Sequence, residues 1–259
     1  MSAQTDKYIT SRLVHHVLTV KKIIKESDYD VAGFGLFLKG SQNYGLNTPT
    51  SDIDSVFIYI PSLMSVVLNK RITFQTHDFT DGDKTQFLDI RDFLRGLLDS
   101  NPQYLKLLFT PYFLLSDKHI AHYLSLSELR NDLAYANPSN WQKSILGQAH
   151  GYWSSIKKPG TPIADRNKKF MHLCRLHRML EEYQAGTNYS RILTLDDHEE
   201  LAKIRTNPDI IHEIYGLNYQ DPQIFHDTKD LTIADPEDLK QSIIEIGTDI
   251  LFPDKFKGA

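Results

Sequence analysis

The sequence predicts an α+β fold, with a mixed strand-and-helix domain over residues 1–115 and a helical domain over residues 116–259. Two apolar runs, at 34–40 and 53–60, flank a loop rich in turn-forming residues, which is typical of paired strands. Before them, apolar residues recur at helical spacing over 5–26. After residue 115, long stretches carry helical patterns only. This order indicates a mixed sheet with flanking helices, followed by packed helices.

Further elements follow from the same apolar patterns. A third strand is predicted over 85–90, and a helix over 91–100 continues from it. Asn101 is placed to cap the next helix, because Pro102 suits a first helical position and the asparagine side chain can accept a free backbone N–H. Gly186 is a favourable stop for one of the later helices. Those later helices are predicted over 125–136, 140–158, 166–186 and 195–205.

The composition excludes several classes of protein. Apolar residues make up 41% of the 259 residues and charged residues 24%, which is ordinary for a globular protein. No apolar stretch is long enough to cross a membrane, and the first residues lack a basic-then-apolar leader. The single cysteine, Cys174, excludes an internal disulfide and a multi-cysteine zinc site. We therefore expect a cytoplasmic protein with no membrane association.

Charge is distributed unevenly along the chain. The formal net charge of −4 argues against a protein that binds nucleic acid over its whole surface. Residues 139–191 nevertheless hold nine Lys and Arg against three Asp and Glu. We expect any polyanionic ligand to meet this segment.

Two carboxylates stand close together in the stretch "GSQNYGLNTPTSDID", which joins the first two predicted strands. Asp52 and Asp54 are two residues apart, so on a strand both side chains point to the same face. Adjacent carboxylates repel each other unless a cation neutralises them. Mg²⁺ is the usual solution, since it prefers oxygen ligands and keeps positions open for phosphate oxygens. This pair therefore predicts a metal site.

Gly40 and Ser41 end the strand before this pair. Glycine allows the backbone to approach a ligand closely, and the serine offers a hydroxyl and a backbone N–H to a phosphate. Next to a metal, such a turn indicates a triphosphate site. A P-loop is excluded because Ser41 stands where lysine is required, and a dinucleotide fingerprint is excluded because Leu38 stands where glycine is required.

Gly40-Ser41, ten intervening residues and Asp52-Ile53-Asp54 resemble the motif of the polymerase-β-type nucleotidyltransferase superfamily. Three blocks over roughly residues 30–190 are similar, in order, to the RNA-repair-associated polymerase-β-like nucleotidyltransferase family. They are "KGSQNYGLNTPTSDIDSVFIYI", "FLDIRDFLRGLLDSNPQYLKLLF" and "KKFMHLCRLHRMLEE". One departure is the sequence Gln42-Asn43-Tyr44-Gly45 after the serine, where the family often has an arginine with Trp-Gly.

A third carboxylate is needed to complete a two-metal site. The candidates are Asp78, Asp81, Asp83, Asp89 and Asp92. The first three lie in a polar, turn-like stretch and are interpreted as solvated. Asp89 lies between apolar neighbours in a predicted strand, where an ionised side chain is rare unless it has a partner. The resemblance also places the third acid there. Asp92 suits the first turn of a helix. We predict Asp89 as the third acid and metal ligand.

A cationic stripe on the predicted helix 166–186 provides a second candidate surface. Lys168, His172 and Arg175 are spaced four and three residues apart and share one face. The resemblance matches Lys169, His172 and Arg175 to nucleotide-binding positions. Lys168 and Lys169 are about 100° apart on a helix, so one of them is expected to face the cleft. A solvated helix face is the alternative reading.

Together these features, with the resemblance, predict a Mg²⁺-dependent nucleotidyltransferase, for which Mn²⁺ is an alternative metal. Asp52, Asp54 and Asp89 would hold the metal, while Gly40, Ser41, Lys169, His172 and Arg175 would bind a nucleoside triphosphate. The acceptor hydroxyl would belong to an RNA end or to a protein. Two other functions remain open: a non-catalytic nucleotide- or RNA-binding module, and a toxin–antitoxin component that modifies a partner protein.

Overall fold

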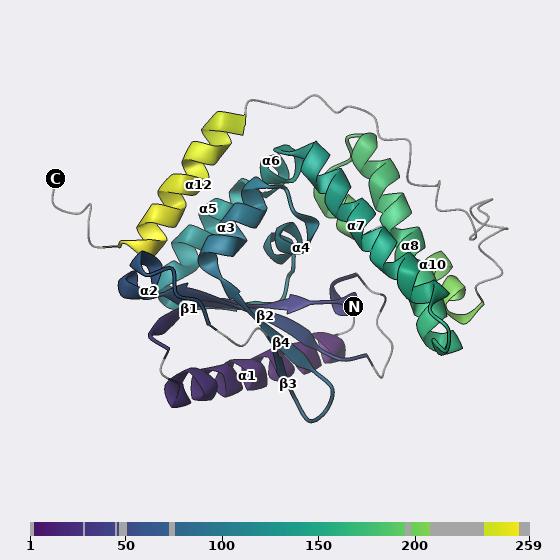
Figure 1. Ribbon diagram of the computed structural model, residues 1–259, viewed down its shortest axis with the longest axis horizontal. Coiled ribbons are helices and arrows are strands. Elements are labelled where there is room, and N and C mark those ends of the chain that lie inside the picture. Colours follow the sequence, from purple (N-terminus) through teal and green to yellow (C-terminus); the bar gives the residue numbers. More distant parts are fainter. Residues whose placement is uncertain are drawn as a thin grey trace.

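A five-stranded mixed sheet, in the order β3-β4-β2-β1-β5, forms the centre of the molecule (Figure 1). The computed structural model describes residues 3–27, 29–44, 46, 51–72, 76–194, 198–207 and 236–253. The strands are β1 (Val31–Lys39), β2 (Asp54–Pro61), β3 (Thr76–Asp78), β4 (Lys84–Asp89) and β5 (Phe113–Leu115). The three predicted strands correspond to β1, β2 and β4. The short strands β3 and β5 were not predicted, because three residues are too few for an alternating pattern.

The register of β2 decides which residues can meet at one edge of the sheet. β1 runs antiparallel to β2 and brings Lys39 opposite Asp54. β4 runs parallel to β2, with Asp54 opposite Lys84 and Tyr59 opposite Asp89. The N-terminal ends of β2 and β4 therefore lie at the same edge, together with the C-terminal end of β1.

Helices cover both faces of the sheet. α1 (Ala3–Glu26) lies along one face, as the apolar spacing predicts (Figure 1). Its Ile9 and Leu13 pack with Phe57 and Phe87 of the sheet in a buried cluster. Even-numbered residues of β2, such as Val56, point to the other side of the sheet and belong to a larger buried cluster there. On β2 and β4 the even-numbered residues thus face the larger helical layer, and the odd-numbered ones face α1.

The larger helical layer contains most of the remaining helices. α3, α4, α5 and α12 lie over the sheet, while α7, α8 and α10 extend beyond its edge (Figure 1). The bounds are α2 (Leu63–Val67), α3 (Ile90–Leu98), α4 (Pro102–Leu105), α5 (Ile120–Glu128), α6 (Arg130–Tyr135), α7 (Pro138–Lys157), α8 (Ile163–Gln184), α9 (Tyr189–Thr194), α10 (His198–Thr206) and α12 (Pro236–Leu251). The described residues also include three 3₁₀ turns, η1 (Ser41–Tyr44), η2 (Lys106–Leu108) and η3 (Asp117–His119).

Local signals at helix ends are confirmed where the structure describes them. The Asn101 side chain accepts a hydrogen bond from the Gln103 backbone N–H at 3.0 Å, so it caps α4 as predicted. Gly186 follows α8 with a φ of +72°, a conformation that glycine adopts without strain. The helix predicted over 125–136 is instead two, α5 and α6, which meet at Leu129.

The larger hydrophobic core crosses the predicted domain boundary. It runs without a break from Phe34 and Phe37 on β1, through Trp141 on α7, to Ile250 on α12. The division at residue 115 therefore separates a part with strands and helices from a part with helices, and the two parts share one core. The division into two domains stays a prediction. Among the described residues, no helix combines the length and the apolar character that crossing a bilayer requires.

Candidate functional site

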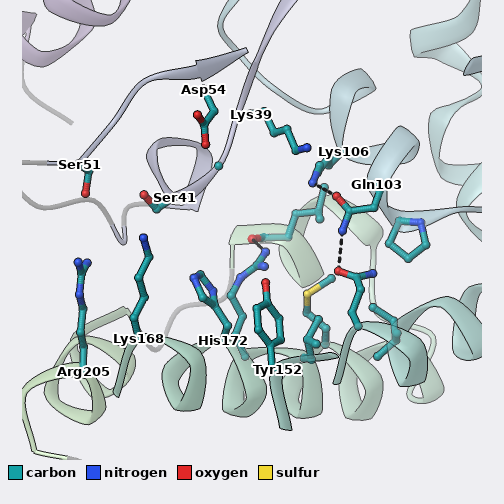
Figure 2. Close-up of a pocket in the computed structure, with 18 of the residues that line it drawn as sticks. Lys39, Ser41, Ser51, Asp54, Gln103, Lys106, Tyr152, Lys168, His172 and Arg205 are labelled. Carbon is teal, nitrogen blue, oxygen red and sulfur yellow. Dashed lines mark hydrogen bonds between the residues drawn. The ribbon is translucent and has the colours of Figure 1, made fainter. Parts of the chain in front are cut away.

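A cavity of about 530 Å³ opens between the shared edge of the sheet and the helices α7, α8 and α10. Figure 2 shows Ser41, Asp54 and Lys39 on one wall, with Tyr152, His172, Lys168 and Arg205 pointing toward them from the helices. The lining residues are Lys39, Gly40, Ser41, Ser51, Asp52, Asp54, Pro102, Gln103, Lys106, Ile145, Gln148, Tyr152, Lys168, His172, Arg175, Leu176, Met179, Leu193 and Arg205.

The turn after β1 brings Gly40 and Ser41 beside the carboxylate of Asp54. Gly40 has a φ of +97°, which residues with a side chain rarely adopt, and this lets the chain turn directly into η1. A Cβ at Gly40 would lie only 3.7 Å from Asp54 Oδ2. The glycine-serine turn and the carboxylate therefore face the same part of the cavity, as the sequence predicts.

Asp52 and Asp54 form the anionic corner of this cavity. Asp52 is exposed just before β2, while Asp54 is half-buried at its first position and shares the parity of Val56. Burial raises the pKa of the Asp54 carboxyl; Lys39 opposes this rise, and the charge of Asp52 adds to it. A carboxylate in this situation gains from a nearby cation. The carboxylate oxygens of Asp54 and Asp52 at the cavity wall are of the ligand type that Mg²⁺ takes, with its other positions open to water and phosphate oxygens.

Five cationic side chains among the described residues also line the cavity. Its lining includes Lys39, Lys106, Lys168, Arg175 and Arg205, which come from β1, η2, α8 and α10. They outnumber the two carboxylates of the lining. Since like charges crowded around a cavity repel one another, a polyanionic ligand would relieve the repulsion. The segment 139–191, which the charge distribution singled out, supplies two of these five cations, and Arg205 follows shortly after it.

Lys106 is a buried member of this set of cations. Burial lowers its pKa to about 7, and the charges of Lys39 and Arg175 add to the decrease. Its Nζ donates a hydrogen bond to Gln103 Oε1. Burial also lowers the pKa of Lys39, whose Nζ donates to Gln86 Oε1 at 3.0 Å. Binding of an anion would stabilise the protonated form of both amines.

His172 lies in the middle of the helical wall as a neutral side chain. Burial lowers its pKa to about 4, with further decreases from Arg175 and Lys168. Its ring stacks on Tyr152 of α7, with centroids 5.3 Å apart and an interplanar angle of 16°. Near neutral pH the imidazole can therefore donate or accept a hydrogen bond without adding charge.

The helix α8 presents Lys168, His172 and Arg175 to the cavity, while Lys169 is not part of its lining. The structure therefore selects Lys168 over the predicted Lys169, which lies about 100° further around the helix. Arg175 is buried, and its Nη2 donates to the Leu193 carbonyl at 3.2 Å, so its guanidinium is held in place from α9.

Asp89 is not brought to this site. It lies at the C-terminal end of β4, five positions along the parallel ladder from the partner of Asp54, a separation of about 16 Å at the usual rise per residue. Asp89 is also an odd-numbered residue of β4, so its side chain points to the face of the sheet that α1 covers. There it is buried, accepts the Arg91 backbone N–H at 2.9 Å as the cap of α3, and pairs with the Arg91 side chain at 2.7 Å. These contacts describe a structural role that differs from the predicted one.

The other four candidates for the third acid also lie outside the cavity lining. Asp78 pairs with Lys84 at 3.3 Å, Asp81 with Arg12, and Asp92 with Arg71. Asp78 and Asp81 are exposed, as the interpretation of solvated turn residues requires. Among the described residues, no cluster of three His, Cys, Asp or Glu side chains is arranged to hold a metal ion.

Asp83 is buried, so the interpretation as a solvated turn residue is wrong for it. Its Oδ1 accepts the Ile53 backbone N–H at 2.8 Å, which fixes the residue between the two aspartates of the motif. Its Oδ2 accepts from Arg12 Nε at 3.0 Å and lies 3.1 Å from His16 Nε2, both on α1. His16 Nδ1 contacts Ser55 Oγ at 2.9 Å. Asp83 thus supports the anionic corner from the opposite face of the sheet.

Several lining residues were missed at the level of the sequence. Lys39 directly precedes Gly40 and ends a buried strand, which is a signal that could have identified it. Lys106 is a lone cation within the apolar run "YLKLLF", where a charge is unexpected. Gln103, Tyr152 and Arg205 carry no comparable signal, because their place depends on how the helices pack.

Comparison with known protein families identifies one family model over this region. The model of the RlaP family, described as the RNA repair pathway DNA polymerase beta family, matches residues 20–185. The match spans the glycine-serine turn, both motif aspartates and the whole of α8. In a comparison with curated proteins, no individual relative matches the chain.

Proposed function

The chain belongs to the RNA repair pathway DNA polymerase beta family, a family of nucleotidyltransferases, and on this premise we propose that it transfers a nucleoside monophosphate. The donor is a nucleoside triphosphate. The acceptor hydroxyl, for which an RNA end is the leading candidate, forms a bond to the α-phosphorus. The bond from this phosphorus to the β-phosphate oxygen breaks, and pyrophosphate leaves.

The observation that carries this proposal is the opposition of charges across the cavity. Asp54 stands beside the Gly40-Ser41 turn on one wall, and Lys168 and Arg205 point toward this wall from the other (Figure 2). Asp52 also belongs to the lining. Carboxylates for a metal and cations for phosphates are the two requirements of phosphoryl transfer, which depends mainly on positioning and charge neutralisation.

Each residue has a definite task in this proposal. Asp52 and Asp54 would hold Mg²⁺ or Mn²⁺, and the bound metal would supply positive charge to the phosphate oxygens during transfer. Ser41 would donate its hydroxyl and backbone N–H to the terminal phosphates. Lys168 and Arg205 would neutralise the same phosphates from the helical wall, and binding there would orient the donor before the acceptor arrives.

A second candidate is a nucleotide-binding module without catalytic activity. The β4 residues that point to the same face of the sheet as Asp54 are Lys84, Gln86 and Leu88, and none of them is acidic. A nucleotide could bind in such a site while the attacking hydroxyl lacks a nearby carboxylate. This observation makes a direct test of transfer the first experiment.

The test is transfer of label from each α-³²P nucleoside triphosphate, with Mg²⁺ or Mn²⁺, to mixed cellular RNA and protein. We expect label in RNA, and its loss in Asp54→Asn. The matched control, Asp78→Asn, changes an exposed carboxylate outside the cavity and should keep full transfer. Label in protein would indicate a protein-modifying enzyme. Tight triphosphate binding without any transfer would support the non-catalytic module instead.

A further inference from the structure

The two ends of the cavity differ in chemistry. Along α8 its lining residues progress from Lys168 through His172 and Arg175 to Leu176 and Met179. From Lys168 to Met179 the helix rises by about 16 Å. Charge is therefore concentrated toward the start of α8, and the lining becomes apolar toward its C-terminal part.

The neighbouring helix α7 continues this gradient. Tyr152 stacks on His172, and Trp153 lies against Phe170 at 6.5 Å, so the two helices run antiparallel. Residues that precede Tyr152 on α7 thus lie beside the later turns of α8. There the cavity is lined by Ile145 and Gln148. Figure 2 shows Gln103 at this end, away from Arg205 and Ser51 at the other.

A pair of amide side chains closes the apolar end. Gln103 Nε2 donates to Gln148 Oε1 at 2.6 Å, which joins α4 to α7. Gln103 Oε1 accepts from Lys106 Nζ, and this donor sets the orientation of the first amide. Gln148 Nε2 donates one hydrogen to the Ser144 carbonyl at 3.3 Å. After these bonds, each of the two amides keeps one hydrogen and one carbonyl lone pair for a ligand.

We propose that Gln103 and Gln148 read the hydrogen-bonding edge of the donor's nucleobase, while Ile145, Leu176 and Met179 pack against the base. This inference rests on the proposed function, because it places the base of the same triphosphate whose phosphates meet Lys168 and Arg205. A nucleobase is a planar, uncharged group with adjacent donors and acceptors on its edge. An amide pair beside apolar side chains offers both a donor and an acceptor to such an edge.

A second cavity, of about 250 Å³, lies beside this end but fits the base less well. It shares Lys39 and Gln103 with the first cavity and is lined further by Val56, Gln86, Leu88, Asn101, Tyr104 and Leu107. It opens against the sheet, on the far side of Lys39 from the α8 stripe. The base of a triphosphate bound along α8 would reach Gln148 without entering it.

The experiment measures how much the base adds to binding. Affinities for the four α,β-methylene nucleoside triphosphates and for inorganic tripolyphosphate are compared by calorimetry, with Mg²⁺ and no acceptor. We expect at least one nucleotide to bind about tenfold or more tightly than tripolyphosphate. Gln148→Leu should remove most of this difference and change the affinity for tripolyphosphate less than about twofold. Gln241→Leu on α12, outside the cavity, is the matched control.

The outcomes separate the base site from the proposed function. If tripolyphosphate binds wild-type protein as tightly as every nucleotide does, the base site is overturned and the proposed function is not. The same holds if Gln148→Leu lowers the affinity for nucleotide and for tripolyphosphate equally while its unfolding midpoint is unchanged. If wild-type protein binds neither ligand, the proposed function fails and the base site fails with it. Two results together would support both the proposed function and the base site. Lys168→Ala and Arg205→Ala should lose binding of tripolyphosphate, and only Gln148→Leu should lose the difference in affinity between nucleotide and tripolyphosphate.

Discussion

At the scale of single residues, the anionic corner depends on a side chain that does not line the cavity. Asp83 accepts the Ile53 backbone N–H and holds Arg12 and His16 on α1. His16 is fully buried, and Phe79 stacks on its ring at 4.3 Å. Buried polar networks stabilise a structure only when each member keeps its partners. The geometry of Asp52 and Asp54 is therefore tied to contacts on the opposite face of the sheet.

Replacement of Asp83 tests this network. Asp83→Ala leaves buried His16 Nε2 and the Ile53 N–H without their acceptor and leaves Arg12 with exposed Asp81 alone. We expect it to lower the free energy of unfolding by about 3 kcal/mol or more. Urea denaturation followed by far-UV circular dichroism measures this. Asp81→Ala removes the exposed partner of the same arginine and should cost less than about 1 kcal/mol. Equal effects of the two changes would contradict the role of Asp83.

Lys106 predicts a pH dependence of stability. Its pKa of about 7 in the folded protein lies below the value of 10.5 for the free side chain, so the unfolded chain binds more protons between these values. The free energy of unfolding should therefore rise with pH across this window, with a slope of at most about 1.4 kcal/mol per pH unit from this group. Lys106→Met should remove that part of the slope between pH 7 and 9, measured by urea denaturation.

The control for this measurement is Lys143→Met, which changes an exposed lysine on α7. It should keep the wild-type slope. A Lys106→Met protein whose slope equals that of wild type would show that the amine of Lys106 titrates as it does in the unfolded chain.

At the scale of elements, strand pairing decided which predictions hold. The apolar patterns identified β1, β2 and β4, and with them the glycine-serine turn and both motif aspartates. They could not show that β4 runs parallel to β2, which separates Asp89 from Asp54 along the strand and by face. A change of one residue in register reverses every side chain. Register and helix packing, which placed Lys106 and Arg205 in the cavity, depend on contacts distant in sequence.

Helix packing near the cavity can be tested at Gly96 of α3. A Cβ there would lie 2.1 Å from the ring of Tyr104 on α4, the helix that carries Gln103. Gly96→Ala should therefore lower the free energy of unfolding by about 1–3 kcal/mol through overpacking. The matched change, Gly151→Ala on α7, meets nothing within 4 Å and should be neutral or stabilising by up to about 1 kcal/mol. Thermal denaturation of both variants provides the comparison; a stabilising effect of Gly96→Ala would contradict the close contact.

At the scale of the whole molecule, the larger core connects the sheet with the later helices. Phe34 and Phe37 of β1 belong to the same buried cluster as Trp141 and Ile250. The two walls of the cavity therefore rest on a shared core. Such an arrangement favours unfolding of the described parts as one cooperative unit.

The two tryptophans make this cooperativity measurable. Trp141 and Trp153 both lie on α7, so their fluorescence follows the helical part, while far-UV circular dichroism follows all elements. We expect the two signals to give the same urea midpoint in a single transition. Two transitions, or midpoints that differ, would support independent domains near residue 115.

The reach of Arg205 across the chain has a further consequence for the order of folding. Its Nη1 donates to the Leu46 carbonyl, 159 positions earlier, at 3.4 Å. A chain emerging from the ribosome exposes the motif aspartates long before α10 is synthesised, and contacts between distant segments form late. The nascent protein would therefore hold its carboxylates and the cations of α8 before Arg205 is in place. The full set of lining cations would be assembled only after α10 has left the exit tunnel and packed against α8.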